Sequence, residues 1–162
     1  MAADKRMIEA DSRQQLRCYS EWAARTFSPD DLFVTVKLKG IRAPEKFVIR
    51  KVQTIYQNAF MRRPHSLLCL PVINWDADFP HLHMLMQNYF YRSSKHYCFA
   101  SLVKGTFLNS CKSPNSVDVR PINENIKATS VYTLLKQGTH VNVVVDAMNI
   151  FPKATQSFTF TH

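Results

Sequence analysis

Two early segments of the chain repeat their hydrophobic residues with the period of an α-helix. In residues 4–26 the apolar side chains share one stripe, formed by Leu16, Tyr19, Trp22 and Ala23. In residues 44–63, which begin with Pro44, the apolar stripe consists of Val48, Val52, Ile55, Tyr56 and Ala59. We therefore expect two amphipathic helices, separated by the break at residues 28–31, and we expect Tyr56 to belong to the core.

Shorter apolar runs predict strands. We expect them at residues 32–39, 66–74, 80–87, 97–104 and 116–121, with late strands or a tail at 141–146 and 157–160. A further helix is expected at 128–138, because Ser or Thr suits a helix start and Gly138 suits its end. This order indicates an α+β fold, an antiparallel sheet with helices packed on it. Residues 1–162 are expected to form one domain with an N-terminal helical extension of about residues 1–28.

Two histidines lie two positions apart in the apolar strand 80–87. Successive side chains on a strand point to opposite faces, so His81 and His83 share one face while Leu82 and its alternate neighbours share the other. Two neighbouring imidazoles can hold one cation, although a pair of partly exposed histidines bonded to neighbours would also explain the pattern. A histidine-triad hydrolase would need a third histidine at Leu85, and a two-histidine phosphodiesterase would need two His-x-Ser/Thr motifs. A barrel amidohydrolase would need a much longer chain.

The helix at 128–138 places Tyr132 and Lys136 one turn apart on the same side. An apolar strand, a His-hydrophobe-His strand and a tyrosine-lysine helix, in this order, resemble the three motifs of the HUH endonucleases. This family contains rolling-circle replication initiators, relaxases and single-strand transposases. The resemblance covers about residues 32–138 and implies a ferredoxin- or RRM-like architecture. It also implies that Tyr132 is the single nucleophile, that Lys136 supplies a positive charge, and that His81 and His83 hold Mg or Mn.

One expected metal ligand departs from the pattern of this family. HUH enzymes usually add a carboxylate from the strand before the histidines, and Asn74 stands at the position where we expect it. An amide oxygen binds a hard cation without a formal charge, so the metal affinity should be weaker. Asp76 or Asp78 from the following turn, or Gln137 from the tyrosine helix, are alternative ligands.

The charge balance of the chain favours a polyanionic partner. The formal net charge is +9, and nucleic acid is the commonest cytoplasmic polyanion. Residues 89–97 interleave aromatic and basic side chains, a mixture that suits single strands because bases stack on rings while phosphates meet the charges. The candidate DNA-binding residues are Lys37, Lys39, Arg62, Arg63, Arg92 and Lys95.

Several protein classes are excluded by missing motifs. The four cysteines form no Cys-x-x-Cys pair, which argues against a zinc ribbon or a disulfide framework. There is no Gly-x-x-x-x-Gly-Lys motif, so no nucleotide is expected and any helicase must come from another protein, with a host helicase or polymerase as a possible partner. No signal peptide or membrane-length apolar run is seen, which favours a cytoplasmic location.

The expected function is nicking and rejoining of single-stranded DNA, at a hairpin or origin, for rolling-circle replication of a plasmid or phage. The alternatives are a transposase or relaxase with the same chemistry, and a non-catalytic protein that binds single-stranded nucleic acid on this fold. Retention of both histidines, Tyr132 and Lys136 in one chain favours a catalytic nickase over the non-catalytic protein.

Overall fold

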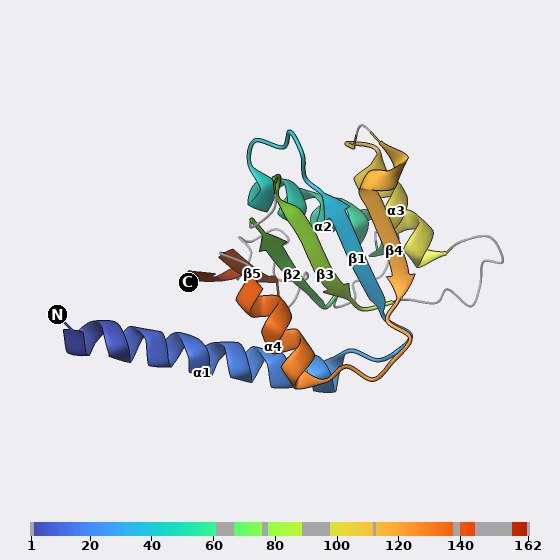
Figure 1. The fold of residues 1–162 in the computed structure, drawn as a ribbon. Coiled ribbons are helices and arrows are strands. Elements are labelled where there is room, and N and C mark those ends of the chain that lie inside the picture. Colours follow the sequence, from blue (N-terminus) through green and yellow to red (C-terminus); the bar gives the residue numbers. More distant parts are fainter. Residues whose placement is uncertain are drawn as a thin grey trace.

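The computed structural model describes residues 2–60, 67–75, 78–88, 98–111, 113–137, 140–144 and 157–161 (Figure 1). The elements, in chain order, are α1 (Ala2–Thr26), β1 (Leu32–Lys37), α2 (Pro44–Phe60), β2 (Cys69–Asn74), β3 (His81–Met86), α3 (Phe99–Leu108), the 3₁₀ turn η1 (Pro114–Ser116), β4 (Val117–Pro121), α4 (Ala128–Gln137), β5 (His140–Val144) and β6 (Ser157–Thr161). The expected α+β fold, an antiparallel sheet with helices packed on it, is confirmed.

The sheet has the strand order β4-β1-β3-β2-β5-β6, and every neighbouring pair is antiparallel. Four of these strands, in the order β4-β1-β3-β2, come from two interleaved strand-helix-strand units, β1-α2-β2 and β3-α3-β4. Each unit leaves a gap that one strand of the other unit fills. Strand β3, which carries the two histidines, therefore lies in the middle of the sheet between β1 and β2.

Alternation along these strands divides the sheet into two apolar faces. One face packs on α2 and α3 and forms the first core, whose main members are Val34, Val36, Ile73, Leu82, Met84, Val48, Val52, Ile55, Phe99, Val103 and Phe107. The opposite face packs on α1 and α4 and forms the second core, made by Leu70, Val72, Leu85, Leu16, Ala23, Phe27, Val131 and Leu135. In Figure 1 α4 lies in front of the sheet, α1 runs below the strands beside α4, and α2 and α3 lie behind the sheet. Among the described residues, no helix is long and apolar enough to cross a membrane.

The strand expected at residues 97–104 is wrong, because residues 99–104 belong to α3 and residue 97 lies outside the described residues. Its buried residues Phe99, Val103, Thr106 and Phe107 recur every three or four positions, which is the helical period. The residues before Lys104 are mostly apolar, so the helical period cannot be recognised there. It becomes visible only in the last turn, at Thr106 and Phe107. The other expected elements are confirmed, with bounds that shift by a few residues.

A buried carboxylate connects the start of β1 to the end of β3. Asp31 accepts hydrogen bonds from the backbone N–H groups of Ser28 and Asn88, each at 2.8 Å. The backbone N–H of Ile122 in turn donates to the Asp31 carbonyl at 2.9 Å. These bonds satisfy a buried charge and link three segments that are distant in sequence. They stabilise the register that sets the histidine face of β3.

The position of Cys98 provides a test of the α3 boundary. Cys98 is the exposed N-cap of α3, where the backbone amide of Ser101 lowers the pKa of the thiol. Burial raises the pKa of the Cys69 thiol to about 12. We expect iodoacetamide at neutral pH to label Cys98 well before Cys69, because the thiolate is the reactive form. Peptide mass spectrometry measures the order of labelling. Equal labelling of Cys98 and Cys69 in the folded protein would contradict these placements.

Candidate functional site

The imidazoles of His81 and His83 stand side by side on the face of the sheet that also carries α1 and α4. Their ring centroids are 6.5 Å apart and their planes differ by 7°. This separation is about the two-residue repeat of a β-strand. Both side chains are partly buried, whereas Leu82 between them is fully buried in the first core. The sequence prediction of a shared histidine face is therefore confirmed.

Each imidazole has a phenylalanine ring beside it. Phe79 lies 4.7 Å from His81 between ring centroids, at an interplanar angle of 26°. Phe33 lies 5.9 Å from His83, at an angle of 16°. We call the four side chains Phe33, His83, His81 and Phe79 the ring row. Lys39 places its Nζ 5.7 Å from the Phe79 centroid, so the ring row ends at an exposed positive charge.

Strand pairing sets the immediate neighbours of His81. Asn74 on β2 and Lys37 on β1 are its direct partners across the sheet. Side chains of directly opposed residues on antiparallel strands project to the same face. Asn74 therefore lies beside His81, as the expected ligand position requires. The exposed Lys37 lies on the other side of His81 and places a positive charge beside this imidazole.

His83 carries a buried polar atom with no partner. Its Nδ1 is inaccessible to solvent and makes no hydrogen bond within the described part of the chain. The pKa of His83 is lowered, first because burial disfavours the charged ring and second because His81 lies nearby. The lowered pKa favours the neutral ring, which keeps one nitrogen lone pair. A buried polar atom without a partner is costly, so a ligand at this nitrogen would be stabilising.

These donors fit a weakly held divalent cation. They comprise two imidazole nitrogens and the amide oxygen of Asn74, which suit Mn or Mg when water or phosphate oxygens complete the coordination. Within the residues that the structure describes, no cluster of three His, Cys, Asp or Glu side chains is found. Asp78 is exposed in the turn, and Asp76 lies outside the described residues. The charge of Lys37 opposes a cation and favours a phosphate.

Helix α4 lies on the same face of the sheet as the two histidines. Val131 and Leu135 are buried in the second core, and the partly buried Tyr132 packs against that core. Lys136 is exposed in the last turn. Among the described residues, no hydrogen bond or ring contact joins Tyr132 to His81 or His83. The structure thus brings the tyrosine helix to the histidine face, while the approach of Tyr132 to the histidines stays a prediction.

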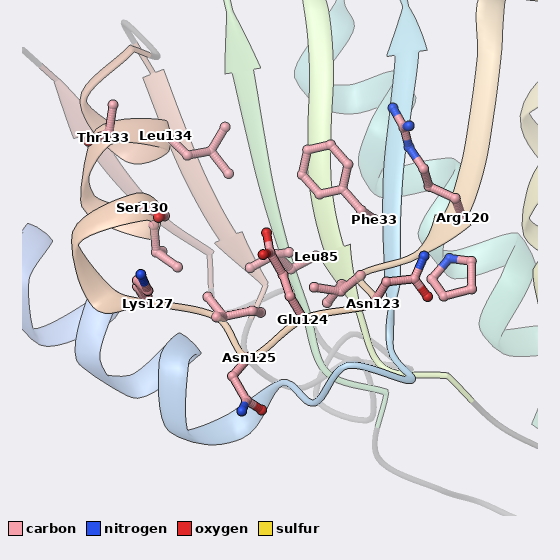
Figure 2. A pocket seen from close by; sticks show the side chains of 14 residues that line it. Phe33, Leu85, Arg120, Asn123, Glu124, Asn125, Lys127, Ser130, Thr133 and Leu134 are labelled. Carbon is pink, nitrogen blue, oxygen red and sulfur yellow. The ribbon is translucent and has the colours of Figure 1, made fainter.

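A cavity of about 660 Å³ lies between this face and α4 (Figure 2). Its apolar lining comprises Phe33, Leu85, Pro121, Ile122, Ile126, Val131 and Leu134, and its polar lining includes Arg120, Asn123, Glu124, Lys127 and Ser130. Phe33 belongs to both the cavity and the ring row, so the two adjoin. Sequence reasoning missed this cavity. The Asn-Glu-Asn turn before α4, in which Asn123 has a positive φ of 66°, was the available signal.

Of the six predicted DNA-binding residues, two lie on this side of the sheet and four lie outside the described residues. Lys37 and Lys39 are exposed near the histidines, and their role in DNA binding stays a prediction. Arg62, Arg63, Arg92 and Lys95 lie outside the described residues. Tyr56 packs on the first core, on the opposite side of the sheet from the histidines, so its expected core role is confirmed.

The histidine face therefore combines a neutral imidazole, a ring row, two exposed lysines and a nearby tyrosine helix. Such a surface can bind phosphate and bases without requiring a deep pocket. No protein-family model, curated protein or solved structure matches the chain, so its interpretation depends on the residues of this face alone.

Proposed function

We propose that this protein nicks and rejoins single-stranded DNA through a covalent phosphotyrosine at Tyr132. The observation that carries the proposal is the common face of His81, His83 and α4 on one antiparallel sheet. The interleaved β1-α2-β2 and β3-α3-β4 units resemble the ferredoxin-like arrangement expected for HUH endonucleases. Rolling-circle replication of a plasmid or phage is the proposed context, and a transposase or relaxase would use the same chemistry.

The ring row and the two lysines suit a single strand as substrate. Unpaired bases stack on aromatic side chains, and phosphates meet the positive charges that accompany them. Phe79 and Lys39 provide such a combination at one end of the ring row. Lys37, beside His81, would hold a phosphate of the same strand next to the histidines.

The chemical step is an in-line exchange at phosphorus. The Tyr132 oxygen forms a bond to the phosphorus, the bond from phosphorus to the 3′ oxygen breaks, and the 3′ oxygen takes up a proton to leave as a hydroxyl. The phenol proton passes to solvent or to a nearby proton acceptor. Lys136 follows Tyr132 by one turn and would stabilise the negative charge of the phenolate. Attack by the 3′ hydroxyl reverses the step and rejoins the strand.

His81, His83 and Asn74 would hold the divalent ion proposed for this reaction, Mg or Mn. When bound, such an ion polarises the phosphate and stabilises charge that develops on its oxygens. The neutral state of His83 is what metal coordination requires, because only an unprotonated nitrogen can donate its lone pair.

A second candidate function is non-catalytic binding of single-stranded nucleic acid. Two observations favour it: Asn74 provides no charge to a metal, and Lys37 adds a positive charge beside His81. The same ring row would serve this function, since stacking and phosphate contacts need no metal.

Incubation with single-stranded hairpin DNA and Mn²⁺ separates the two functions. We expect a covalent protein-DNA adduct that survives denaturing electrophoresis, together with a shorter DNA product that ends in a 3′ hydroxyl. Extension of that product by a polymerase checks the 3′ end. A hairpin library that is bound but yields neither adduct nor cleavage would favour the non-catalytic function.

A further inference from the structure

A basic hollow lies at the first half of α2, on the opposite side of the sheet from the histidines. Its volume is about 430 Å³. Four positively charged residues line it: Arg42, Lys46, Arg50 and Lys51. We call it the α2 hollow. In Figure 1 α2 lies behind the sheet, whereas α4 lies in front of it.

The charges of the α2 hollow are unbalanced. Arg42 lies just before α2, and Lys46 and Arg50 are four residues apart on that helix. Like charges at this spacing destabilise a helix. Glu45 is the one acidic residue in the sequence from 41 to 57. In the described part of the chain, none of the four cations forms an ion pair. A bound polyanion would relieve this repulsion.

The lining of the α2 hollow suits phosphates and offers bases no stacking surface. Phe47 is its one aromatic residue. The Nζ of Lys51 lies 5.4 Å from the Phe47 centroid, and Phe107 lies 6.3 Å away on the core side. The ring is thereby occupied by neighbours of its own chain. Proteins that hold single strands combine cations with free aromatic faces, so the α2 hollow resembles a backbone-binding surface instead.

We propose that the α2 hollow binds the phosphate backbone of duplex DNA. Lys46 and Arg50 are separated by about 6 Å along the helix axis, and a duplex presents a phosphate on each strand about every 3.4 Å along its axis. Both residues can therefore contact one strand of a duplex. Paired bases are stacked inside the duplex and need no protein ring. The protein would bind double-stranded DNA through α2 and single-stranded DNA through the histidine face.

Fluorescence anisotropy with a short blunt duplex, in chelator and over a salt series, tests this proposal. The test variant is Lys46→Glu/Arg50→Glu. Its matched control is Arg17→Glu/Arg25→Glu, which changes the net charge equally at two exposed residues of α1 on the other face. We expect the test variant to lose at least about tenfold more duplex affinity than the control. The slope of log affinity against log salt should fall by about 2, since each lost phosphate contact contributes about 0.9.

A single strand of the same length provides the comparison that identifies the ligand. The test variant should bind it about as well as the control does. Equal losses of duplex affinity in the two variants would overturn the proposal, as would a loss for single strands as large as that for duplexes. Circular dichroism should show a folded variant, because Lys46 and Arg50 are exposed. The readout requires no cleavage, so failure of the nicking proposal would leave it intact.

Discussion

Tyr132→Phe is expected to abolish the covalent adduct and strand cleavage while single-stranded DNA still binds nearly as well. The substitution removes the attacking oxygen and keeps the ring that packs against the second core. Loss of an essential nucleophile lowers a rate by about 10⁴-fold or more. Quantitative adduct formation on hairpin DNA measures the chemistry, and anisotropy measures binding.

Tyr56→Phe is the matched control for this experiment. Tyr56 is also a partly buried tyrosine on a helix, but it packs on the first core on the opposite side of the sheet. Its substitution should leave adduct formation unchanged. An adduct that persists in Tyr132→Phe and disappears in Tyr56→Phe would assign the nucleophile to α2 and refute the proposed site.

Lys136→Ala should slow the reaction without eliminating the adduct, because it removes a stabilising charge and leaves the nucleophile.

Local periodicity predicted most of the fold, and α3 shows where it fails. The alternation of His81, Leu82 and His83 predicted that Leu82 and the two histidines lie on opposite faces of β3, and the burial of Leu82 in the first core bears this out. In α3 the apolar residues before Lys104 are nearly continuous, so a short window cannot distinguish a buried strand from a helix. Phe107, one further turn along, settles the period. A longer window would have predicted this helix.

The surroundings of the histidines depend on contacts that periodicity does not encode. Phe33 belongs to β1, and it reaches His83 only because β1 pairs with β3 in one particular register. Register between distant segments is a tertiary property. The same limit applies to α4, whose sequence predicts an apolar side but not the part of the sheet on which it packs. Asn74 was located correctly beside His81 because β2 and β3 are consecutive antiparallel strands.

The second large effect expected is loss of metal binding in His81→Ala and His83→Ala. Each substitution removes one of two imidazole nitrogens, and we expect the Mn²⁺ affinity to fall by at least about tenfold. Calorimetric titration of Mn²⁺ into DNA-free protein measures this directly. Thr35→Ala is the control, because Thr35 lies directly opposite His83 on β1 and is not a proposed ligand. Chelator should stop cleavage by the wild-type protein, and full activity in chelator would refute the metal role.

Substitutions beside His81 test how this site treats charge. Asn74→Glu should tighten Mn²⁺ binding because it adds a carboxylate directly across from His81, and Asn74→Ala should weaken binding. Lys37→Ala should also tighten Mn²⁺ binding, because the substitution removes a positive charge beside His81. If Asp78→Ala abolished Mn²⁺ binding while Asn74→Ala had no effect, the third ligand would come from the turn. Asn74 would then be a neighbour of the metal site without being part of it.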